Sequence, residues 1–228
     1  MKVQAIIPAA GSGSRMAGKK SKLLLTLADK PLIVHTLQAF EDCDIIESVI
    51  LVVPRDLAET YKTIVEECGL KKVKEFIAGG KSRCESISNA LSYLGPDADL
   101  VVVHDGARPV VSVDLIKRAV QKCKNEKAVV AAVRVKPTIK QVHRDDGLVE
   151  RTLKRDDLYE IQTPQVFKKS ILLEAYEQAA SLDATDDASL VEQIGFPVKI
   201  IEGEYRNIKV TTEEDLLVAE TFLKNRPA

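Results

Sequence analysis

A loop of small residues follows the first apolar run of the chain and is the clearest candidate for a binding site. The run Val3–Ile7 is followed by Pro8 and then Ala9-Ala10-Gly11-Ser12-Gly13-Ser14-Arg15-Met16. Small side chains let backbone N–H groups approach a ligand closely, and phosphate suits such groups. Arg15 and Lys22 add two cations beside the loop. The pattern therefore indicates a nucleotidyltransferase site, which binds a triphosphate and stabilises charge that develops at one phosphorus.

Other interpretations of this loop are a dinucleotide-binding turn, a P-loop and a solvated basic segment. A dinucleotide-binding turn needs a small residue where Met16 stands and an acidic residue about 20 residues further on, but a Lys-rich stretch fills the region beyond. The spacing from Gly13 to Lys20 is that of a P-loop, except that Lys20 replaces the Ser or Thr whose hydroxyl binds magnesium. The nucleotidyltransferase interpretation is favoured, and the solvated basic loop is its alternative.

A second candidate follows the apolar run Leu100–His104, as Asp105-Gly106-Ala107-Arg108-Pro109. These residues place an acid, a glycine and a cation after the carboxyl end of a predicted strand, where ligands bind in open α/β sheets. Asp105 is a candidate magnesium ligand, because Mg²⁺ takes one or two carboxylates together with phosphate oxygens. The alternative is that Asp105 or His104 only stabilises a turn, and we expect His104 to be structural.

A third candidate is Gly79-Gly80-Lys81-Ser82-Arg83, which opens a predicted helix with Ser86 one turn in. A helix N-terminus can bind an anion or the edge of a base, although Ser82 as a simple N-cap is the alternative. Weaker candidates, each of which is also compatible with a turn or a cap, are Arg155, Thr163-Pro164-Gln165, Thr185-Asp186-Asp187 and Asn207-Ile208-Lys209-Val210-Thr211.

The elements that must position these residues alternate in type along the chain. Short apolar runs alternate with amphipathic segments, which is typical of a mostly parallel, doubly wound α/β sheet. The predicted strands are Val3–Ile7, Ser48–Val53, Val73–Ile77, Leu100–His104, Ala128–Val135 and Val198–Ile201. The predicted helices are 31–40, 56–67, 83–94, 113–124, 169–181 and 212–224.

One region departs from this alternation and predicts a protruding β-hairpin arm at about 137–157. Residues 139–143 and 148–153 alternate in polarity around Asp146-Gly147, and Asp-Gly between two such runs is a strong hairpin signal. A hairpin that projects from an α/β body leaves its apolar residues exposed unless another chain covers them. The pattern therefore predicts a homodimer.

Composition limits the classes of protein to which the chain can belong. With 228 residues, 45% hydrophobic and 29% charged, it is expected to be a single globular domain over 1–228. A net charge of -1 argues against nucleic-acid or membrane binding by overall charge. The four cysteines form no Cys-x-x-Cys pair, and no apolar run spans a bilayer or resembles a signal peptide. We expect a cytoplasmic location.

Taken in order, the separated motifs resemble the 2-C-methyl-D-erythritol 4-phosphate cytidylyltransferases of the non-mevalonate isoprenoid pathway. The resemblance covers nearly the whole chain. It implies a nucleotide-diphospho-sugar transferase-like fold, a reaction of CTP with 2-C-methyl-D-erythritol 4-phosphate that releases pyrophosphate, and Mg²⁺ as cofactor. It also implies a homodimer in which Arg155 reaches the partner's site.

The resemblance also implies roles for individual residues. Arg15 and Lys22 would stabilise the pentavalent α-phosphorus, Arg155 and Lys209 would complete the catalytic set, and Asp105 would bind the metal. The nucleotide would be held by Ala9, Ala10, Gly11, Ser12, Gly13, Gly80, Ser86, Asp105 and Gly106. The methylerythritol phosphate would be held by Arg108, Thr138, Thr163 and Thr185, together with Arg155 and Lys209.

The chain departs from the family pattern at two places. It has Ser21-Lys22-Leu23 where Pro-Lys-Gln is usual, and Gly106 where Ala is frequent. Without the stiffening proline, we expect the preceding loop to be more mobile. The alternatives are a ribitol-5-phosphate cytidylyltransferase, against which Gly106-Ala107 argues, and a catalytically silent nucleotide-binding regulator, against which Arg15, Lys22 and Lys209 argue.

Overall fold

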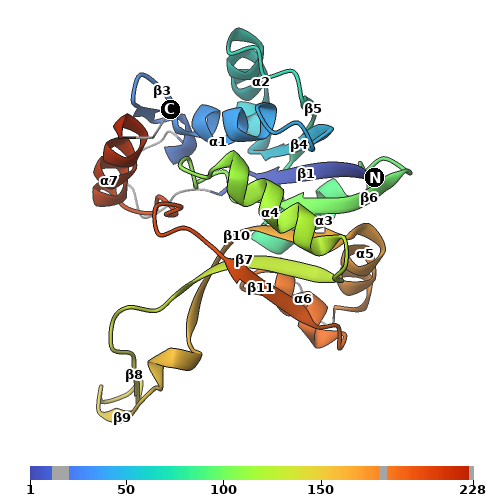
Figure 1. The fold of residues 1–228 in the computed structure, drawn as a ribbon. Coiled ribbons are helices and arrows are strands. Elements are labelled where there is room, and N and C mark those ends of the chain that lie inside the picture. Colours follow the sequence, from blue (N-terminus) through green and yellow to red (C-terminus); the bar gives the residue numbers. More distant parts are fainter. Residues whose placement is uncertain (12–20, 180–183, 226–228) are drawn as a thin grey trace.

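The six predicted strands and a seventh, β10, form one sheet in the order β11-β7-β10-β6-β1-β4-β5 (Figure 1). The computed structural model describes residues 1–11, 21–179 and 184–225. β10 runs antiparallel to β6 and β7, while the other neighbours pair in parallel. The predicted mostly parallel α/β fold is therefore confirmed. The strands are β1 (Lys2–Pro8), β4 (Ser48–Val53), β5 (Val73–Ala78), β6 (Ala98–Val103), β7 (Ala128–Arg134), β10 (Tyr159–Lys168) and β11 (Val198–Glu202).

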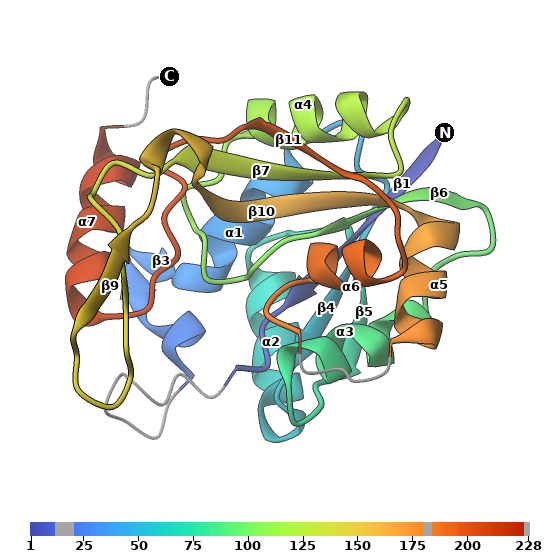
Figure 2. The same ribbon diagram turned by 90° about the horizontal axis from the view of Figure 1, so that it is seen from below.

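Helices cover both faces of the sheet, and this explains why the central strands are apolar on both sides. Leu100–Val103 are fully buried, as parallel strands under two helical layers must be. Four helices pack against one apolar cluster, α1 (Leu32–Glu41), α2 (Ala58–Glu67), α4 (Val113–Cys123) and α7 (Glu213–Lys224). Three pack against the other, α3 (Arg83–Leu91), α5 (Lys169–Gln178) and α6 (Asp187–Gln193). Figure 2 shows α4 on one side of β7 and β10, with α5 and α6 on the opposite side.

Local capping residues set several helix starts, and Ser82, which the sequence allows as an N-cap, is one of them. The Ser82 hydroxyl accepts a hydrogen bond from Glu85 N at 3.0 Å and caps α3. Thr212 and Asp215 form a reciprocal capping box at the start of α7. In the described ranges, no helix is long and apolar enough to cross a membrane.

Two elements differ from the sequence prediction. Thr163-Pro164-Gln165, for which the sequence allows a turn or a cap, lies within β10. Pro164 has no N–H to donate, and it stands where the pairing of β10 with β7 shifts register between Ile161 and Gln165. The structure also contains helix α6, which is not among the predicted helices. Its N-cap Asp186 is one of the predicted cap candidates, but a helix of seven residues is too short to show a periodic pattern.

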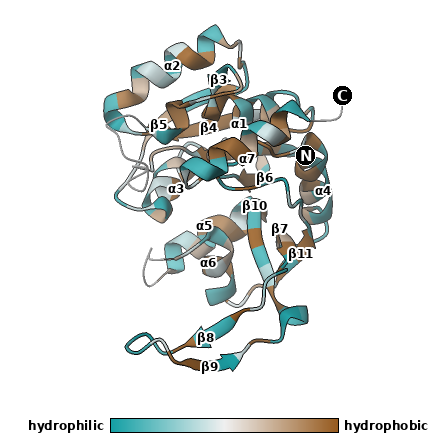
Figure 3. Ribbon diagram, turned by 90° about the vertical axis from the view of Figure 1, so that its left-hand side faces the viewer, coloured by the Kyte–Doolittle hydropathy of each residue, from teal (hydrophilic) through white to brown (hydrophobic). Residues whose placement is uncertain are grey.

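The predicted arm is confirmed as a hairpin that extends away from the sheet (Figure 1). It consists of β8 (Lys140–Val142) and β9 (Val149–Thr152), and Gly147 has the positive φ of +71° that favours glycine. A 3-10 turn, η3 (Arg155–Asp157), leads back to β10. Figure 3 shows both hydrophobic and hydrophilic colour on the arm, and Leu148 is 63% exposed.

Candidate active site

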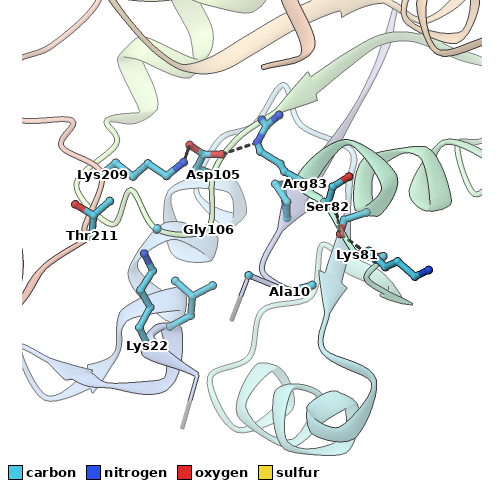
Figure 4. A pocket seen from close by; sticks show the side chains of 15 residues that line it. Ala10, Lys22, Lys81, Ser82, Arg83, Asp105, Gly106, Lys209 and Thr211 are labelled. Carbon is cyan, nitrogen blue, oxygen red and sulfur yellow. Dashed lines mark hydrogen bonds and ion pairs between the residues drawn. The ribbon is translucent and has the colours of Figure 1, made fainter. Parts of the chain in front are cut away.

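A pocket of about 440 Å³ lies where β1, β5 and β6 end. The carboxyl ends of parallel neighbours meet at one edge of a sheet, so the three loops that follow these strands come together there. Figure 4 shows the labelled side chains around this pocket. Its described lining residues are Pro8, Ala10, Gly11, Lys22, Leu23, Gly80, Lys81, Ser82, Arg83, Ser86, Asp105, Gly106, Ala107, Lys209 and Thr211.

Gly79 allows the segment that leads into α3 to approach the loop after β1. A Cβ atom on Gly79 would stand 2.2 Å from the Cβ of Ala10, so a larger residue would push the two loops apart. Gly80 N donates to the Ser86 hydroxyl at 3.0 Å, and that hydroxyl donates to the Ser82 carbonyl at 2.8 Å. One side of the pocket is therefore a compact wall of backbone and small side chains.

The two departures from the usual family residues lie next to one another in space. A Cβ atom on Gly106 would lie 3.3 Å from Leu23 Cδ1, 2.9 Å from Ile33 Cδ1 and 3.1 Å from the Pro8 carbonyl oxygen. Glycine at 106 therefore leaves room for Leu23, which is 3% exposed. The Gly106 carbonyl accepts from the Thr36 hydroxyl at 2.9 Å, which holds this loop against α1.

Two lysines that are distant in sequence lie on the opposite wall. Lys22 Nζ donates to the Val210 carbonyl at 2.7 Å, and Lys209 Nζ lies 2.9 Å from Asp105 Oδ2. Val210 N donates to the Ala107 carbonyl at 2.8 Å, so the segment after β11 is attached to the loop after β6. The fold thus brings Lys22 and Lys209 to the same pocket.

Asp105 is the centre of the charge distribution in the pocket. Its Oδ1 accepts from Arg83 Nε at 3.2 Å, and its Oδ2 lies 3.7 Å from Arg108 Nε as well as close to Lys209. Burial alone would raise the pKa of Asp105, but the three cations outweigh it and hold this pKa well below its usual range. The carboxylate is therefore ionised and is a poor proton acceptor at neutral pH.

The role of Arg83 was missing from the sequence interpretation. Its guanidinium links Asp105 to the fully buried Asp187, whose Oδ2 lies 2.8 Å from Arg83 Nη2. The available signal was the position of Arg83, at the first turn of a helix that starts at the carboxyl edge of the sheet. Its two carboxylate partners are distant in sequence, so no local pattern identifies them.

Other predicted site residues lie elsewhere in the structure. Thr163 is buried behind the pocket, where its hydroxyl accepts from Asp105 N at 3.0 Å and lies 3.0 Å from His104 Nδ1. Arg108 is buried and donates through Nη1 to the Asn207 carbonyl at 2.7 Å. Neither residue is among the described residues that line the pocket, although each contacts Asp105, which does. Their contact with a substrate therefore stays a prediction.

The remaining predicted residues are on or near the surface, or are not described. Thr185 is exposed just before α6, and Thr138 and Arg155 are exposed on the arm, where Arg155 Nη1 donates to the Lys136 carbonyl at 2.9 Å. Ser12, Gly13 and Arg15 lie outside the described residues, as does the loop for which greater mobility is expected. No group of three or more His, Cys, Asp or Glu side chains within 1–11, 21–179 and 184–225 is arranged to hold a metal ion.

His104 should make the stability of the protein depend on pH. The ring is fully buried, and burial lowers its pKa from 6.5 to about 3. Between these values the unfolded chain binds a proton at this side chain and the native chain does not. The free energy of unfolding should therefore fall as the pH falls from 6.5 toward 3, by up to about 1.4 kcal/mol per pH unit from this group.

Urea unfolding across this pH range measures the effect. His104→Asn should show a shallower pH dependence than the wild type. The control is His143→Asn in the exposed turn of the arm, which should keep the wild-type dependence. Equal slopes for wild type and His104→Asn would contradict the prediction.

Comparison with known proteins gives a consistent result over nearly the whole chain. The family model of 2-C-methyl-D-erythritol 4-phosphate cytidylyltransferase (IspD) matches residues 3–225. Proteins of that name from Pelotomaculum thermopropionicum and Alkaliphilus oremlandii are 46% and 43% identical over 228 residues, which are 99% of this chain and 95% and 96% of theirs.

Solved structures agree with the sequence comparison. The crystal structure of 4-diphosphocytidyl-2C-methyl-D-erythritol synthase from Anaerococcus prevotii is similar with a TM-score of 0.85 at 34% identity, and the match covers 98% of this chain and 99% of that one. The 2-C-methyl-D-erythritol 4-phosphate cytidylyltransferase from Thermus thermophilus has a TM-score of 0.79 at 30% identity, covering 96% and 98%.

Proposed function

The chain belongs to the 2-C-methyl-D-erythritol 4-phosphate cytidylyltransferase family, and we propose that the pocket between Ala10, Asp105 and Lys209 is the site of its reaction. The enzyme joins CTP and 2-C-methyl-D-erythritol 4-phosphate, forms 4-diphosphocytidyl-2-C-methyl-D-erythritol and releases pyrophosphate. The observation that supports this placement is the arrangement of Lys22 and Lys209 on one wall, opposite the small residues that follow β1 and β5.

The chemistry requires positioning and charge neutralisation more than proton transfer. An oxygen of the sugar phosphate forms a bond to the α-phosphorus of CTP, and the bond from that phosphorus to the bridging oxygen breaks, so pyrophosphate leaves with the electron pair. The attacking phosphate monoester is already largely ionised at neutral pH and needs no general base. The ionised Asp105 and the buried, neutral His104 agree with this, because neither is suited to accept a proton from the substrate.

The proposed roles divide the pocket between the two substrates. Ala9, Ala10, Gly11, Gly80, Ser86 and Gly106 hold the cytidine side, together with Ser12 and Gly13. Lys22, with Arg15, stabilises the charge that grows on the α-phosphate, because a fixed cation there acts more strongly on the transition state than on bound CTP. Lys209, Thr185, Thr138 and Arg155 hold the sugar phosphate.

Asp105 is suited to a magnesium ion that arrives with the triphosphate of CTP. It is the one carboxylate among the described lining residues, and it is kept ionised by its neighbours. A single carboxylate completed by phosphate oxygens and water is a normal environment for Mg²⁺. When bound, the ion neutralises phosphate charge. Lys209, whose side chain is 42% exposed, can turn from Asp105 toward a phosphate.

Asp105→Asn should raise the Mg²⁺ concentration needed for half-maximal activity by about tenfold or more, a loss of ~1.4 kcal/mol in binding. A neutral amide is a poorer ligand for a hard cation, and it also leaves Arg83, Arg108 and Lys209 without their shared counter-charge. Magnesium titration of pyrophosphate release measures the shift. His104→Asn is the control, because its buried ring lies outside the pocket. An unchanged titration in Asp105→Asn would remove Asp105 from the metal site.

We further propose that the chain is a homodimer and that Arg155 acts in the partner's pocket. The arm exposes Val142, Leu148 and Val149, with 47%, 63% and 57% of each residue accessible, which is unfavourable unless another surface covers them. Arg155 lies on the arm and is not among the described residues that line the pocket of its own chain. A second copy that packs against the arm would cover these apolar residues and would bring its own pocket close to Arg155.

Pyrophosphate release with each nucleoside triphosphate crossed against each sugar phosphate tests the substrate assignment. We expect release only with CTP and 2-C-methyl-D-erythritol 4-phosphate. Equal or faster release with ribitol 5-phosphate would favour the ribitol enzyme. CTP binding without release in any combination would favour a silent nucleotide-binding protein.

A further inference from the structure

A largely buried polar network at the pocket wall joins Arg83 and Asp105, which line the pocket, to Asp187 and Tyr176. Arg83 Nε donates to Asp105 Oδ1 at 3.2 Å, and Arg83 Nη2 lies 2.8 Å from Asp187 Oδ2. Asp187 Oδ1 accepts from the Tyr176 hydroxyl of α5 at 2.6 Å. The side chain of Asp187 is fully buried and that of Arg83 is 23% exposed. One guanidinium therefore connects two carboxylates on different elements.

The two carboxylates belong to different halves of the proposed site. Asp105 lies on the loop after β6, at the nucleotide side, whereas Asp187 is the first residue of α6, directly after Thr185 and Asp186 on the sugar-phosphate side. The start of α6 is also held by Gln165 of β10, which donates to Asp186 Oδ2 at 2.7 Å and accepts from Ala188 N at 3.2 Å. Within the described part of the chain, Arg83 thus connects this anchored helix start directly to Asp105.

We propose that Arg83 is a positioning residue, whose guanidinium holds Asp105 and the start of α6 in one fixed arrangement so that the two substrate phosphates meet in the reactive geometry. This inference rests on the proposed function of the pocket. Alignment of reacting groups contributes strongly to rate, and residues that orient a ligand-binding carboxylate typically change activity by about 10–100-fold when they are replaced.

The contacts distinguish Arg83 from Lys209, the exposed cation beside Asp105. Lys209 is half-exposed and has one ammonium group, so it can leave Asp105 for a phosphate. Arg83 is held by Asp187 as well as by Asp105. Burial alone would lower the pKa of Arg83, but the negative charges of Asp187 and Asp105 outweigh burial and raise this pKa, so the guanidinium stays charged. Only a planar guanidinium holds Nε and Nη2 in fixed directions, so that Nε hydrogen-bonds to Asp105 while Nη2 forms an ion pair with Asp187, and a lysine ammonium cannot reproduce this.

Three variants of the full-length protein test the proposal. Arg83→Lys keeps the positive charge but removes the two fixed N–H directions of the guanidinium. Asp187→Asn keeps the shape of the side chain that holds Arg83 but removes its negative charge. Each should lower kcat about 10–100-fold, with the KM for CTP changed less than about threefold, because the alignment of bound groups is lost and not the binding of the nucleotide. CTP-binding stoichiometry gives the fraction of folded sites, so kcat is expressed per intact site.

Tyr176→Phe is the matched control within the same network. It removes only the hydroxyl that donates to Asp187 and leaves both contacts of Arg83 in place. It should lower the unfolding temperature but keep kcat within about twofold of the wild type. A purely structural network predicts instead that all three variants lose stability while kcat per intact site is unchanged.

The proposal is overturned if Arg83→Lys and Asp187→Asn both keep kcat within about twofold of the wild type, or if Tyr176→Phe loses as much kcat as they do. If Arg83→Lys does not fold, Asp187→Asn alone decides between these outcomes. Wild-type pyrophosphate release separates this test from the function itself. Absence of release in the wild type contradicts the proposed function, whereas normal release in the wild type and in both variants contradicts only the role of Arg83.

Discussion

Replacing Lys22 by alanine should lower kcat by about 10²–10³-fold, while the affinity for CTP falls far less. The ammonium of Lys22 lines the pocket beside Val210, at the side where Lys209 also enters. Charge accumulates on the α-phosphate as the new P–O bond forms, so a cation placed there stabilises the transition state more than it stabilises bound CTP. Single-turnover rates and CTP binding, measured on the same protein, separate the two effects.

Lys81→Ala is the control for Lys22→Ala. Lys81 lines the same pocket from the α3 side, so either variant removes one positive charge from the surroundings of CTP. If Lys22 acted only by general attraction, both variants would weaken CTP binding alike and kcat would not change. A kcat for Lys22→Ala close to that of Lys81→Ala would remove Lys22 from the catalytic residues.

Arg15→Ala is expected to lower kcat as much as Lys22→Ala does. This expectation rests on the sequence, in which Arg15 belongs to the loop of small residues after the first strand.

Mixing two inactive variants, Arg155→Ala and Lys22→Ala, should restore activity if Arg155 serves the partner's site. In each heterodimer one site then carries both defects and the other carries neither. Statistical exchange of equal amounts makes half of the dimers heterodimers, so the mixture should recover about a quarter of wild-type activity. If Arg155 served its own chain, every site would keep one defect and mixing would restore nothing.

The mixing experiment has a control on the same arm. Arg151 of β9 donates to Gln141 Oε1 within the hairpin at 2.9 Å, so Arg151→Ala removes a nearby positive charge and should itself remain active. Subunit exchange is verified with chains that carry different affinity tags. Exchange without recovered activity would contradict the cross-subunit role. A monomer in sedimentation would contradict the homodimer as well.

Departures from the sequence prediction occur where distant residues decide the outcome. Pro164 and its polar neighbours argue against a strand, yet β10 forms because β6 and β7 supply partners on both sides and the interrupted pairing accommodates the proline. Arg83 is an ordinary first-turn residue in sequence. It becomes part of a buried network because α6, more than 100 positions later, places Asp187 beside it.

The sequence by itself determined the features that depend on neighbours along the chain. The apolar run Leu100–Val103 predicts a strand that is buried on both faces, Ser82 predicts a helix start, and Asp146-Gly147 predicts the turn of the arm. Each follows from residue type and short spacing, because burial of apolar side chains, N-capping and positive φ are local requirements. The family resemblance rests on motifs of the same local kind.

Only the tertiary structure decided which of these local features meet. The strand order places the ends of β1, β5 and β6 at one edge of the sheet, and attachment of Val210 to Ala107 brings Lys209 into the pocket near Lys22. It also places Arg83, Arg108 and Lys209 around one carboxylate, which lowers the pKa of Asp105. Coulombic interactions depend on distance in space and on burial, and neither quantity is encoded in the spacing of residues along the chain.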